Sequence, residues 1–218
     1  MRFRIFLALM LVSLTGCQPS DDTDRATAAM QHVRPHLGHA FGRPVFLRIV
    51  KETRTLELRV QEKGRWRLLK TYPILAMSGE LGPKTAEGDR QAPEGFYATT
   101  LPLLNPRSKF HLSFNIGYPN AYDRNKGRTG SFIMVHGSNR SIGCFAMGDP
   151  AIEEIYTMVH QALKAGQSAV PIQIYPFEMT PERMEQERNS PHYDFWQSLL
   201  PGWQHTHLHG SPASPQYR

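Results

Sequence analysis

The stretch SFIMVHGSNRSIGC, from Ser131 to Cys144, places a histidine and a cysteine eight residues apart. The apolar run from Phe132 to Val135 predicts a strand that leads to His136, and the Gly, Ser and Asn residues after it predict a turn back to Cys144. An imidazole that accepts a proton and a thiol that becomes a thiolate are the two groups that covalent acyl transfer needs. The stretch therefore predicts a site in which Cys144 is the nucleophile and His136 the base.

The second cysteine lies in an N-terminal segment that predicts export. Arg2 and Arg4 precede an apolar run over residues 5–14, which is too short to span a bilayer and is typical of a secretory signal. The run ends in Leu-Thr-Gly-Cys at Cys17, which resembles the lipobox of bacterial lipoproteins. We predict a lipoprotein signal peptide over residues 1–16 and lipidation of Cys17. The alternative is an ordinary signal peptide with an incidental cysteine.

The residue after Cys17 bears on location. It is Gln18 and not an aspartate, which by the usual sorting rule indicates the outer membrane in a cell that has one. The predicted location is the periplasm, with a lipid anchor in the inner leaflet of the outer membrane. Exported proteins usually pair their cysteines, but acylation of Cys17 leaves Cys144 without a partner. An unpaired thiol in an exported chain indicates a functional role.

Net charge narrows the class of partner only slightly. The net charge falls from +6 to +4 when cleavage of the signal peptide removes Arg2 and Arg4. A mildly basic protein suits an acidic polymer of the cell envelope, and export argues against nucleic acid.

The remaining sequence predicts a mainly β fold with a few helices. Strands are expected between residues 45 and 72, with a turn at 63–64, and at 96–100, 109–116 and 170–175. Helices are expected at 25–40, with Pro35 breaking or kinking the helix, at 149–165, capped by Asp149, and at 180–200, split by Pro191. The expected divisions are a tether and helix (17–43), a catalytic domain (44–178), a C-terminal helical extension (179–204) and a flexible tail (205–218).

Other roles for the Cys–His pair must be weighed. Cys144 could be a buried structural cysteine and His136 a satisfied core histidine. A zinc site is disfavoured because zinc needs three or four protein ligands and no second cysteine is available. The tail histidines (His205, His207 and His209) fit flexible surface residues better than metal ligands. We predict neither a metal nor an organic cofactor.

The residues beside the pair predict its geometry. No acidic residue lies between Phe132 and Met147, so a backbone carbonyl is expected to orient His136. Gly143 removes side-chain bulk next to the sulfur. The N–H groups of Gly143 and Cys144 are expected to point at a developing oxyanion.

At this level of detail the chain resembles the L,D-transpeptidase (YkuD) catalytic-domain family, and within it the YafK-like branch. The similarity extends from about residue 44 to about residue 203. The motifs that resemble the family are Gly82-Pro-Lys84, Gly88-Asp89, Pro93-Glu-Gly-Phe-Tyr97, the segment 115–124, His136-Gly137, and Ser141-Ile-Gly143-Cys-Phe-Ala-Met147.

The resemblance implies a β-sandwich-like catalytic domain of the L,D-transpeptidase type, with Cys144 as nucleophile, His136 as base and the carbonyl of Gly137 as the third member. It implies action on peptidoglycan stem peptides, at an acyl bond of meso-diaminopimelate, through a thioester that an amine or water resolves. It thereby implies a role in cell-wall biogenesis and cell shape.

One departure from the wider family leaves open whether the thioester is resolved by an amine or by water. Many members have Arg or Asn shortly after the cysteine, but here Phe145 and Ala146 follow it. The YafK-like branch shares this feature, and the activity attributed to it is hydrolysis of the bond between diaminopimelate and an attached lipoprotein. Transpeptidation and hydrolysis therefore both stay open. A non-catalytic lipoprotein that binds the cell wall is the alternative of another class.

Substrate-binding residues are expected in the loops around the pair. Arg124 is expected to bind a substrate carboxylate, because guanidinium binds carboxylates bidentately; Lys84 and Arg128 are weaker candidates. Tyr118 is expected to line the pocket. Ser141 is expected within the turn, either hydrogen-bonded there or in contact with substrate.

Overall fold

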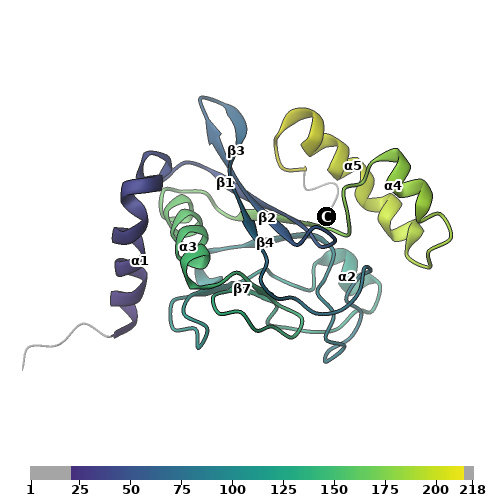
Figure 1. Cartoon of the computed structure of the whole chain (residues 1–218), viewed down its shortest axis with the longest axis horizontal. Coiled ribbons are helices and arrows are strands. Elements are labelled where there is room, and N and C mark those ends of the chain that lie inside the picture. The colour runs from purple at the N-terminus through teal and green to yellow at the C-terminus, as the bar shows by residue number, and fades with distance from the viewer. Residues whose placement is uncertain (1–20, 214–218) are drawn as a thin grey trace, which may run out of the picture.

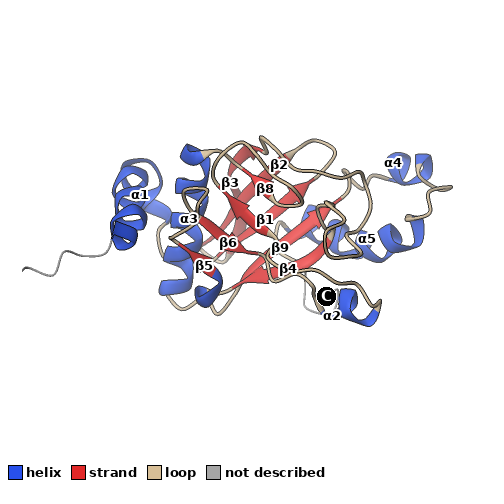
Figure 2. Cartoon of the chain, turned by 90° about the horizontal axis from the view of Figure 1, so that it is seen from below, coloured by secondary structure: helices blue, strands red, loops and turns tan. Residues whose placement is uncertain are grey.

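The computed structural model describes residues 21–213 and contains two β-sheets that share a core (Figures 1 and 2). The first sheet has the order β3-β2-β1-β9-β4, with β1 Val45–Val50, β2 Thr55–Glu62, β3 Arg65–Pro73, β4 Gly95–Thr99 and β9 Val170–Tyr175. The second has the order β5-β6-β7-β8, with β5 Leu104–Asn105, β6 Ser113–Asn115, β7 Met134–His136 and β8 Phe145–Ala146. The predicted class, mainly β with a few helices, is confirmed.

Alternation of side chains explains how the sheets meet. In β2 the apolar residues Leu56, Leu58 and Val60 are fully buried, while the residues between them are partly exposed. The β2–β3 turn consists of Lys63 and Gly64, both with positive φ, as a two-residue hairpin turn requires. The large core contains the apolar residues of both sheets, so the sheets pack face to face.

Helices cover the two ends of this layered body. They are α1 Asp21–Leu37, α2 Ala121–Asn125, α3 Asp149–Lys164, α4 Pro181–Gln186 and α5 Tyr193–His209, with short 3-10 turns η1 Gly38–Ala40 and η2 Leu101–Leu103. Figure 1 shows α1 packed beside α3 at one end and α4 with α5 at the other. None of the helices within residues 21–213 is both long enough and apolar enough to cross a bilayer.

The C-terminal helix covers a second, smaller core. Trp196, Leu199 and Trp203 of α5 are buried against Phe96, Tyr175 and Phe177, on the opposite face of the first sheet. The rings of Trp196 and Phe177 meet edge to face at 5.1 Å. The helix is therefore a packed part of the fold.

The end of this helix corrects two expected boundaries. The helical extension does not stop at 204, and residues 205–209 are helical instead of a flexible tail. Pro201 lies inside α5, and the stop signal is Gly210, which adopts the left-handed conformation that ends many helices. Gly202 permits the close approach of α5 to the sheet, because a Cβ there would lie 2.5 Å from the ring of Phe96.

The N-terminal helix also differs from expectation. It begins at Asp21, so part of the expected polar tether is helical, and Pro35 lies within its last turns without ending it. The predicted signal peptide, Cys17 and residues 214–218 lie outside the described residues.

Two further local expectations were wrong. The expected strand 109–116 is only three residues long, and His111 lies outside it with φ of 68°. Asp149 does not cap α3: Gly148 is the N-cap, and the Asp149 carboxylate accepts the Ser138 N–H at 2.7 Å. Pro150 in the first turn and Gly166 just after the helix agree with expectation.

Candidate active site

The histidine ends strand β7 of the second sheet, and the cysteine immediately precedes the neighbouring strand β8. β7 and β8 run parallel, with Val135 paired to Phe145 and His136 paired to Ala146. Val135 and Phe145 are fully buried and belong to the core, so the alternate side chains on these strands face the other way. Cys144 comes just before β8, beside Met134, whose N–H donates to its Sγ at 3.4 Å. The fold therefore brings His136 and Cys144 to the same face of the sheet.

A backbone carbonyl orients the imidazole, and it belongs to Gly137. Nδ1 of His136 lies 2.6 Å from Gly137 O, which fixes the proton on Nδ1 because a carbonyl only accepts. Nε2 has no hydrogen-bond partner among residues 21–213 and is left able to accept a proton. His136 is 2% exposed, and its ring packs against the Phe110 ring at 4.7 Å.

Only glycine fits beside this histidine. The Gly137 N–H donates to Phe110 O and Leu112 O at 3.0 and 3.1 Å. A Cβ on Gly137 would lie 2.6 Å from both Phe110 O and Asp149 Oδ1. The close packing explains why the residue that orients the imidazole has no side chain.

Burial favours the neutral form of both reacting groups. It lowers the pKa of His136, and the hydrogen bond to Gly137 opposes this only in part. Burial raises the pKa of the Cys144 thiol, against the opposing effects of the Met134 N–H and the charge of Lys84. The resting site therefore contains a neutral imidazole and a neutral thiol, so proton transfer must accompany attack.

The turn before Cys144 is fixed by two serine hydroxyls. Ser141 Oγ donates to Cys144 O at 2.7 Å, and the Gly143 N–H donates to Ser78 Oγ at 2.7 Å. Gly143 has φ of 86°, a conformation that other residues rarely adopt. The expectation that the Gly143 N–H is open to an oxyanion is therefore corrected, because Ser78 already occupies it.

A small cavity of about 120 Å³ opens beside Cys144. Phe132 and Ile142 line it and are 76% and 73% exposed, so they form an apolar rim. Charged groups on its wall come from Lys84, Glu87 and Arg90 of the long loop between β3 and β4. Of these three, the sequence suggested only Lys84, and only as a weaker candidate.

Lys84 is held in this wall by partners of its own. Its side chain is 4% exposed, and Nζ donates to Asp89 Oδ1 at 2.5 Å and to Ala86 O at 2.7 Å. Burial acts to raise the pKa of Asp89, but hydrogen bonds from Ala86, Lys84, Gln91 and Thr85 outweigh it and lower the pKa to about 2. The cavity wall thus contains a fixed ion pair.

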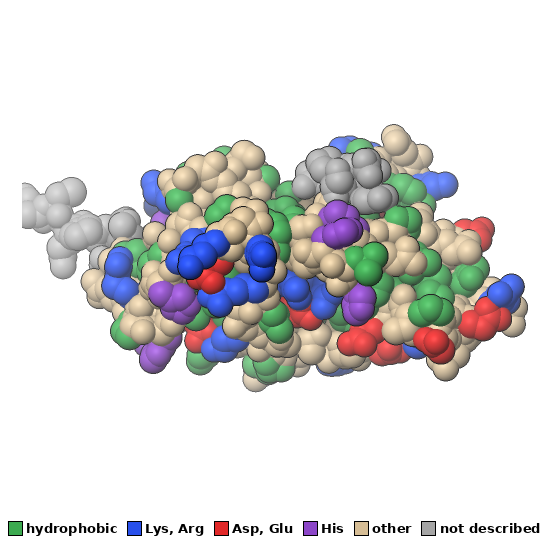
Figure 3. Space-filling model, turned by 90° about the horizontal axis from the view of Figure 1, so that it is seen from above, with side chains coloured by type: hydrophobic (Ala, Val, Ile, Leu, Met, Phe, Trp, Pro, Cys, Tyr) green, Lys and Arg blue, Asp and Glu red, His purple; other side chains and the backbone are tan. Residues whose placement is uncertain are grey.

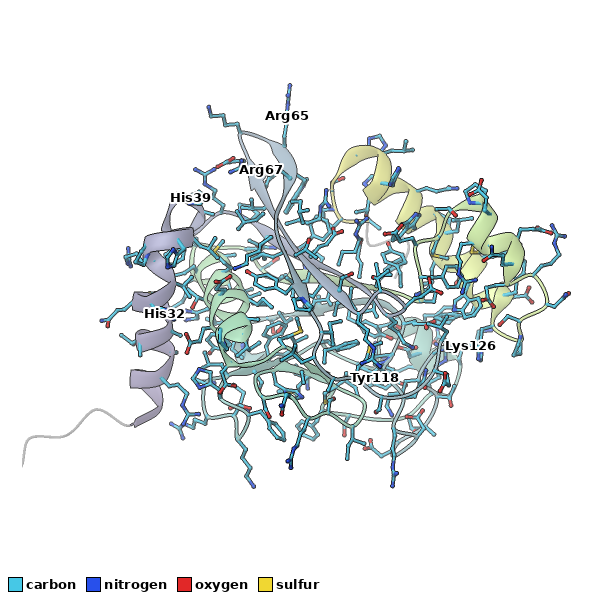
Figure 4. The ribbon with its side chains drawn as sticks, in the orientation of Figure 1. His32, His39, Arg65, Arg67, Tyr118 and Lys126 are labelled. Carbon is cyan, nitrogen blue, oxygen red and sulfur yellow. The ribbon has the colours of Figure 1, made fainter. Side chains whose placement is uncertain are left out.

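The other predicted substrate-binding residues lie elsewhere. Tyr118 is buried and its hydroxyl donates to Lys84 O at 3.2 Å, so it supports the wall without lining the cavity (Figure 4). Arg124, in α2, donates to Pro119 O and does not line the cavity. Arg128 is paired with Asp123 at 2.8 Å. Of the predicted substrate-binding residues, only Ser141 lies in the Cys144 turn.

A group of exposed basic side chains lies away from this site. Lys and Arg side chains gather on the upper face of the molecule (Figure 3), where Arg65 and Arg67 extend from the β2–β3 hairpin, on the side opposite β7 (Figures 1 and 4). Net charge therefore gave no guide to the position of the site.

A buried ion pair anchors the loop that forms the cavity wall. Nζ of Lys51, at the end of β1, lies 2.9–3.0 Å from four acceptors: Glu80 O, Gly82 O, Ala92 O and Glu94 Oε1. Neither side chain of the Lys51–Glu94 pair is exposed. Burial lowers the pKa of Lys51, and the charge of Glu94 opposes this. Three carbonyls of one loop are thereby fixed to the first sheet.

The same pair connects the loop to the C-terminal helix. Glu94 Oε1 also accepts the Gly82 N–H at 2.7 Å, and Oε2 accepts the Trp196 Nε1–H at 2.7 Å. Both carboxylate oxygens are therefore hydrogen-bonded, as burial of a charge requires.

The N-terminal helix supports the opposite side of the site. Arg25 of α1 donates to Ser108 O and His111 O at 3.1 and 2.8 Å, next to Phe110, which packs on His136. Glu153 of α3 lies within 2.8 Å of both His32 and His111. Helix α1 is thus attached to the segment behind the imidazole. Within residues 21–213, no group of three or more His, Cys, Asp or Glu side chains could hold a metal ion.

Comparisons with known proteins point to one family. The family model described as the L,D-transpeptidase catalytic domain (YkuD) matches residues 44–174. Two Escherichia coli proteins, from strain K12 and from O157:H7, are both named "Putative L,D-transpeptidase YafK". Each is 45% identical over 205 residues, which is 93% of this chain and 81% of theirs.

Among solved structures, a mutant of the helical cell shape determining protein Pgp2 from Campylobacter jejuni has a similar fold, with a TM-score of 0.51 at 19% identity. The match covers 86% of this chain but spans only 65% of that protein. The matched residues 44–174 include His136, Cys144 and the residues that line the cavity. The chain belongs to the L,D-transpeptidase (YkuD) catalytic-domain family.

Proposed function

We propose that this protein is a peptidoglycan-modifying cysteine enzyme that acts on an acyl bond of meso-diaminopimelate in cell-wall stem peptides. The observation that supports this most strongly is the imidazole of His136. Its Nδ1 is hydrogen-bonded to Gly137 O and its Nε2 is free, and the free thiol of Cys144 lies immediately before the neighbouring strand β8. Family membership supports the substrate class.

The reaction begins with attack of Cys144 Sγ on the acyl carbon while His136 Nε2 takes the thiol proton. The tetrahedral intermediate has a negative oxygen, which a backbone N–H stabilises. The C–N bond then breaks, the amine leaves with the proton from His136, and a thioester remains on Cys144. An amine or a water molecule loses a proton to His136, attacks the thioester and releases the thiol.

Transfer to an amine is the first candidate for the second half of the reaction, and hydrolysis is the alternative. Phe145 and Ala146 are fully buried and offer no polar side chain to an acceptor amine. This observation favours the hydrolytic alternative, in which a covalently attached lipoprotein is released from peptidoglycan.

The proposed setting is the periplasm. Lipidation of Cys17 would attach the protein to the outer membrane, and only 3 residues separate Cys17 from the start of α1 at Asp21. Helix α1 in turn packs on α3 of the catalytic domain. The partners would be peptidoglycan and, in the alternative, its attached lipoprotein.

Mass spectrometry of digested sacculi tests the function. Sacculi with lipoprotein still attached are incubated with the wild-type protein and with Cys144→Ala. New diaminopimelate cross-links or exchanged terminal D-amino acids, seen with the wild type only, identify a transpeptidase. Loss of the lipoprotein remnant without new cross-links identifies the hydrolase. Sacculi that are bound but unchanged in composition would contradict both and support the non-catalytic wall-binding protein.

A further inference from the structure

Ser78 contacts the nucleophile turn from a loop far away in sequence. Its hydroxyl donates to Arg90 O at 2.6 Å and accepts the Gly143 N–H at 2.7 Å. A serine hydroxyl has one proton to donate, and here Arg90 O receives it. Ser78 therefore links the wall of the cavity to the Ile142–Gly143 peptide group, one residue before Cys144.

Because of this contact, only one of the two N–H groups expected to stabilise an oxyanion is free to do so. The Gly143 N–H is occupied by Ser78 Oγ, whereas the Cys144 N–H has no acceptor among residues 21–213. The Cys144 carbonyl is fixed separately by Ser141 Oγ at 2.7 Å. The Ile142–Gly143 and Cys144–Phe145 peptide groups are thus restrained, and the N–H of the Gly143–Cys144 peptide group between them is left open.

The support behind Ser78 is rigid. Its carbonyl accepts the Ala92 N–H at 3.0 Å, and the Ala92 carbonyl lies 3.0 Å from Lys51 Nζ. Gln91 donates to the carbonyls of Glu80 and Gly82 in the same loop, at 2.6 and 2.8 Å. The hydroxyl of Ser78 is therefore held in place by the buried pair that anchors the loop.

We propose that Ser78 is a positioning residue for catalysis: by holding the Gly143 N–H, it directs the Cys144 N–H at the oxygen of the acyl group under attack. The inference rests on the proposed function, because it assigns a role within the thioester-forming step. Catalytic donors must already be in position when charge develops, so loss of the hydroxyl reduces the rate without removing the nucleophile.

Two reactions of the same thiol separate positioning from general support. Attack on p-nitrophenyl acetate passes through a tetrahedral oxyanion, expels p-nitrophenolate and leaves an acetyl thioester on Cys144. Attack on iodoacetamide displaces iodide from a saturated carbon and forms no oxyanion. A change in oxyanion stabilisation affects the first reaction only.

The experiment uses the full protein as wild type, Ser78→Ala, Ser78→Thr and the control Ser198→Ala, which removes a hydroxyl on α5 that donates to Phe195 O. The p-nitrophenolate burst and the alkylation of Cys144 are measured for each. Ser78→Ala is expected to slow the burst roughly 10- to 100-fold, with little change in alkylation. Ser78→Thr, which keeps the hydroxyl, is expected to restore most of the burst rate.

Three results would overturn the inference. An unchanged or faster burst in Ser78→Ala would mean that the Gly143 N–H is itself the oxyanion donor. An equal loss of burst and alkylation would show that Ser78 only supports the fold of the turn. A wild-type protein with no burst dependent on Cys144 would overturn the proposed function as well, which distinguishes that failure from the other two.

Discussion

His136→Gln is expected to slow acylation of Cys144 by about 10² to 10⁴-fold, the usual contribution of a general base. The thiol is neutral at rest because burial raises its pKa, so without the imidazole no group on the neighbouring strand removes its proton. The rate is measured as the burst of p-nitrophenolate from p-nitrophenyl acetate. The matched control is His39→Gln, since His39 lies in η1 beyond the far end of α1 (Figure 4).

The pH profile checks the same assignment. Burial lowers the pKa of His136, so the wild-type rate should fall only as the pH drops below the usual histidine value of about 6.5, where the imidazole becomes protonated. His136→Gln should lack this acid limb and gain rate only at alkaline pH, as the thiol ionises. An acid limb that persists in His136→Gln would mean that another group is the base.

Lys51→Met is expected to lower the free energy of unfolding by about 3–5 kcal/mol, because it leaves the carboxylate of Glu94 buried without a countercharge. Three loop carbonyls would also lose their donor. The measurement is urea unfolding, with the midpoint and slope fitted together.

The matched control is Lys70→Met. Lys70 pairs with Glu154 on the surface and is 46% exposed, so its loss should cost only about 0–1 kcal/mol. If Lys51→Met costs no more than Lys70→Met, the buried pair does not anchor the loop, and the account of how Ser78 is held is wrong.

The local features of the site could be predicted from sequence because they depend on neighbouring residues. An apolar run, a glycine-rich turn and a cysteine without a partner were enough to single out His136 and Cys144. The helix expected at 149–165 is present as α3, and its residues Ile152, Ile155 and Val159 are fully buried.

The contacts that hold the site could not be predicted, because they join residues far apart in the chain. Ser78 and Gly143 are 65 positions apart, and nothing in the loop composition links them. In the sequence, Lys51 resembles a solvent-exposed lysine at the end of a strand. Only the fold shows that it is buried against Glu94. Arg124 seemed suited to a substrate carboxylate, but α2 places it outside the cavity.

The end of α5 shows the limit of local signals. The expected helix ended at residue 200, but the packing of Trp203 against Tyr175, at 5.1 Å between ring centroids, favours its continuation past Pro201. The true stop is Gly210, whose left-handed conformation is visible only in three dimensions.

The central claim is that Cys144 forms a thioester with the diaminopimelyl acyl group, and the most direct measurement is mass spectrometry of the acid-quenched protein during turnover of purified stem peptide. We predict that the peptide containing Cys144 gains the mass of the acyl group, that neutral hydroxylamine removes this mass, and that Cys144→Ala never shows it. Turnover by the wild type with no adduct, or an adduct on another residue, would contradict the account.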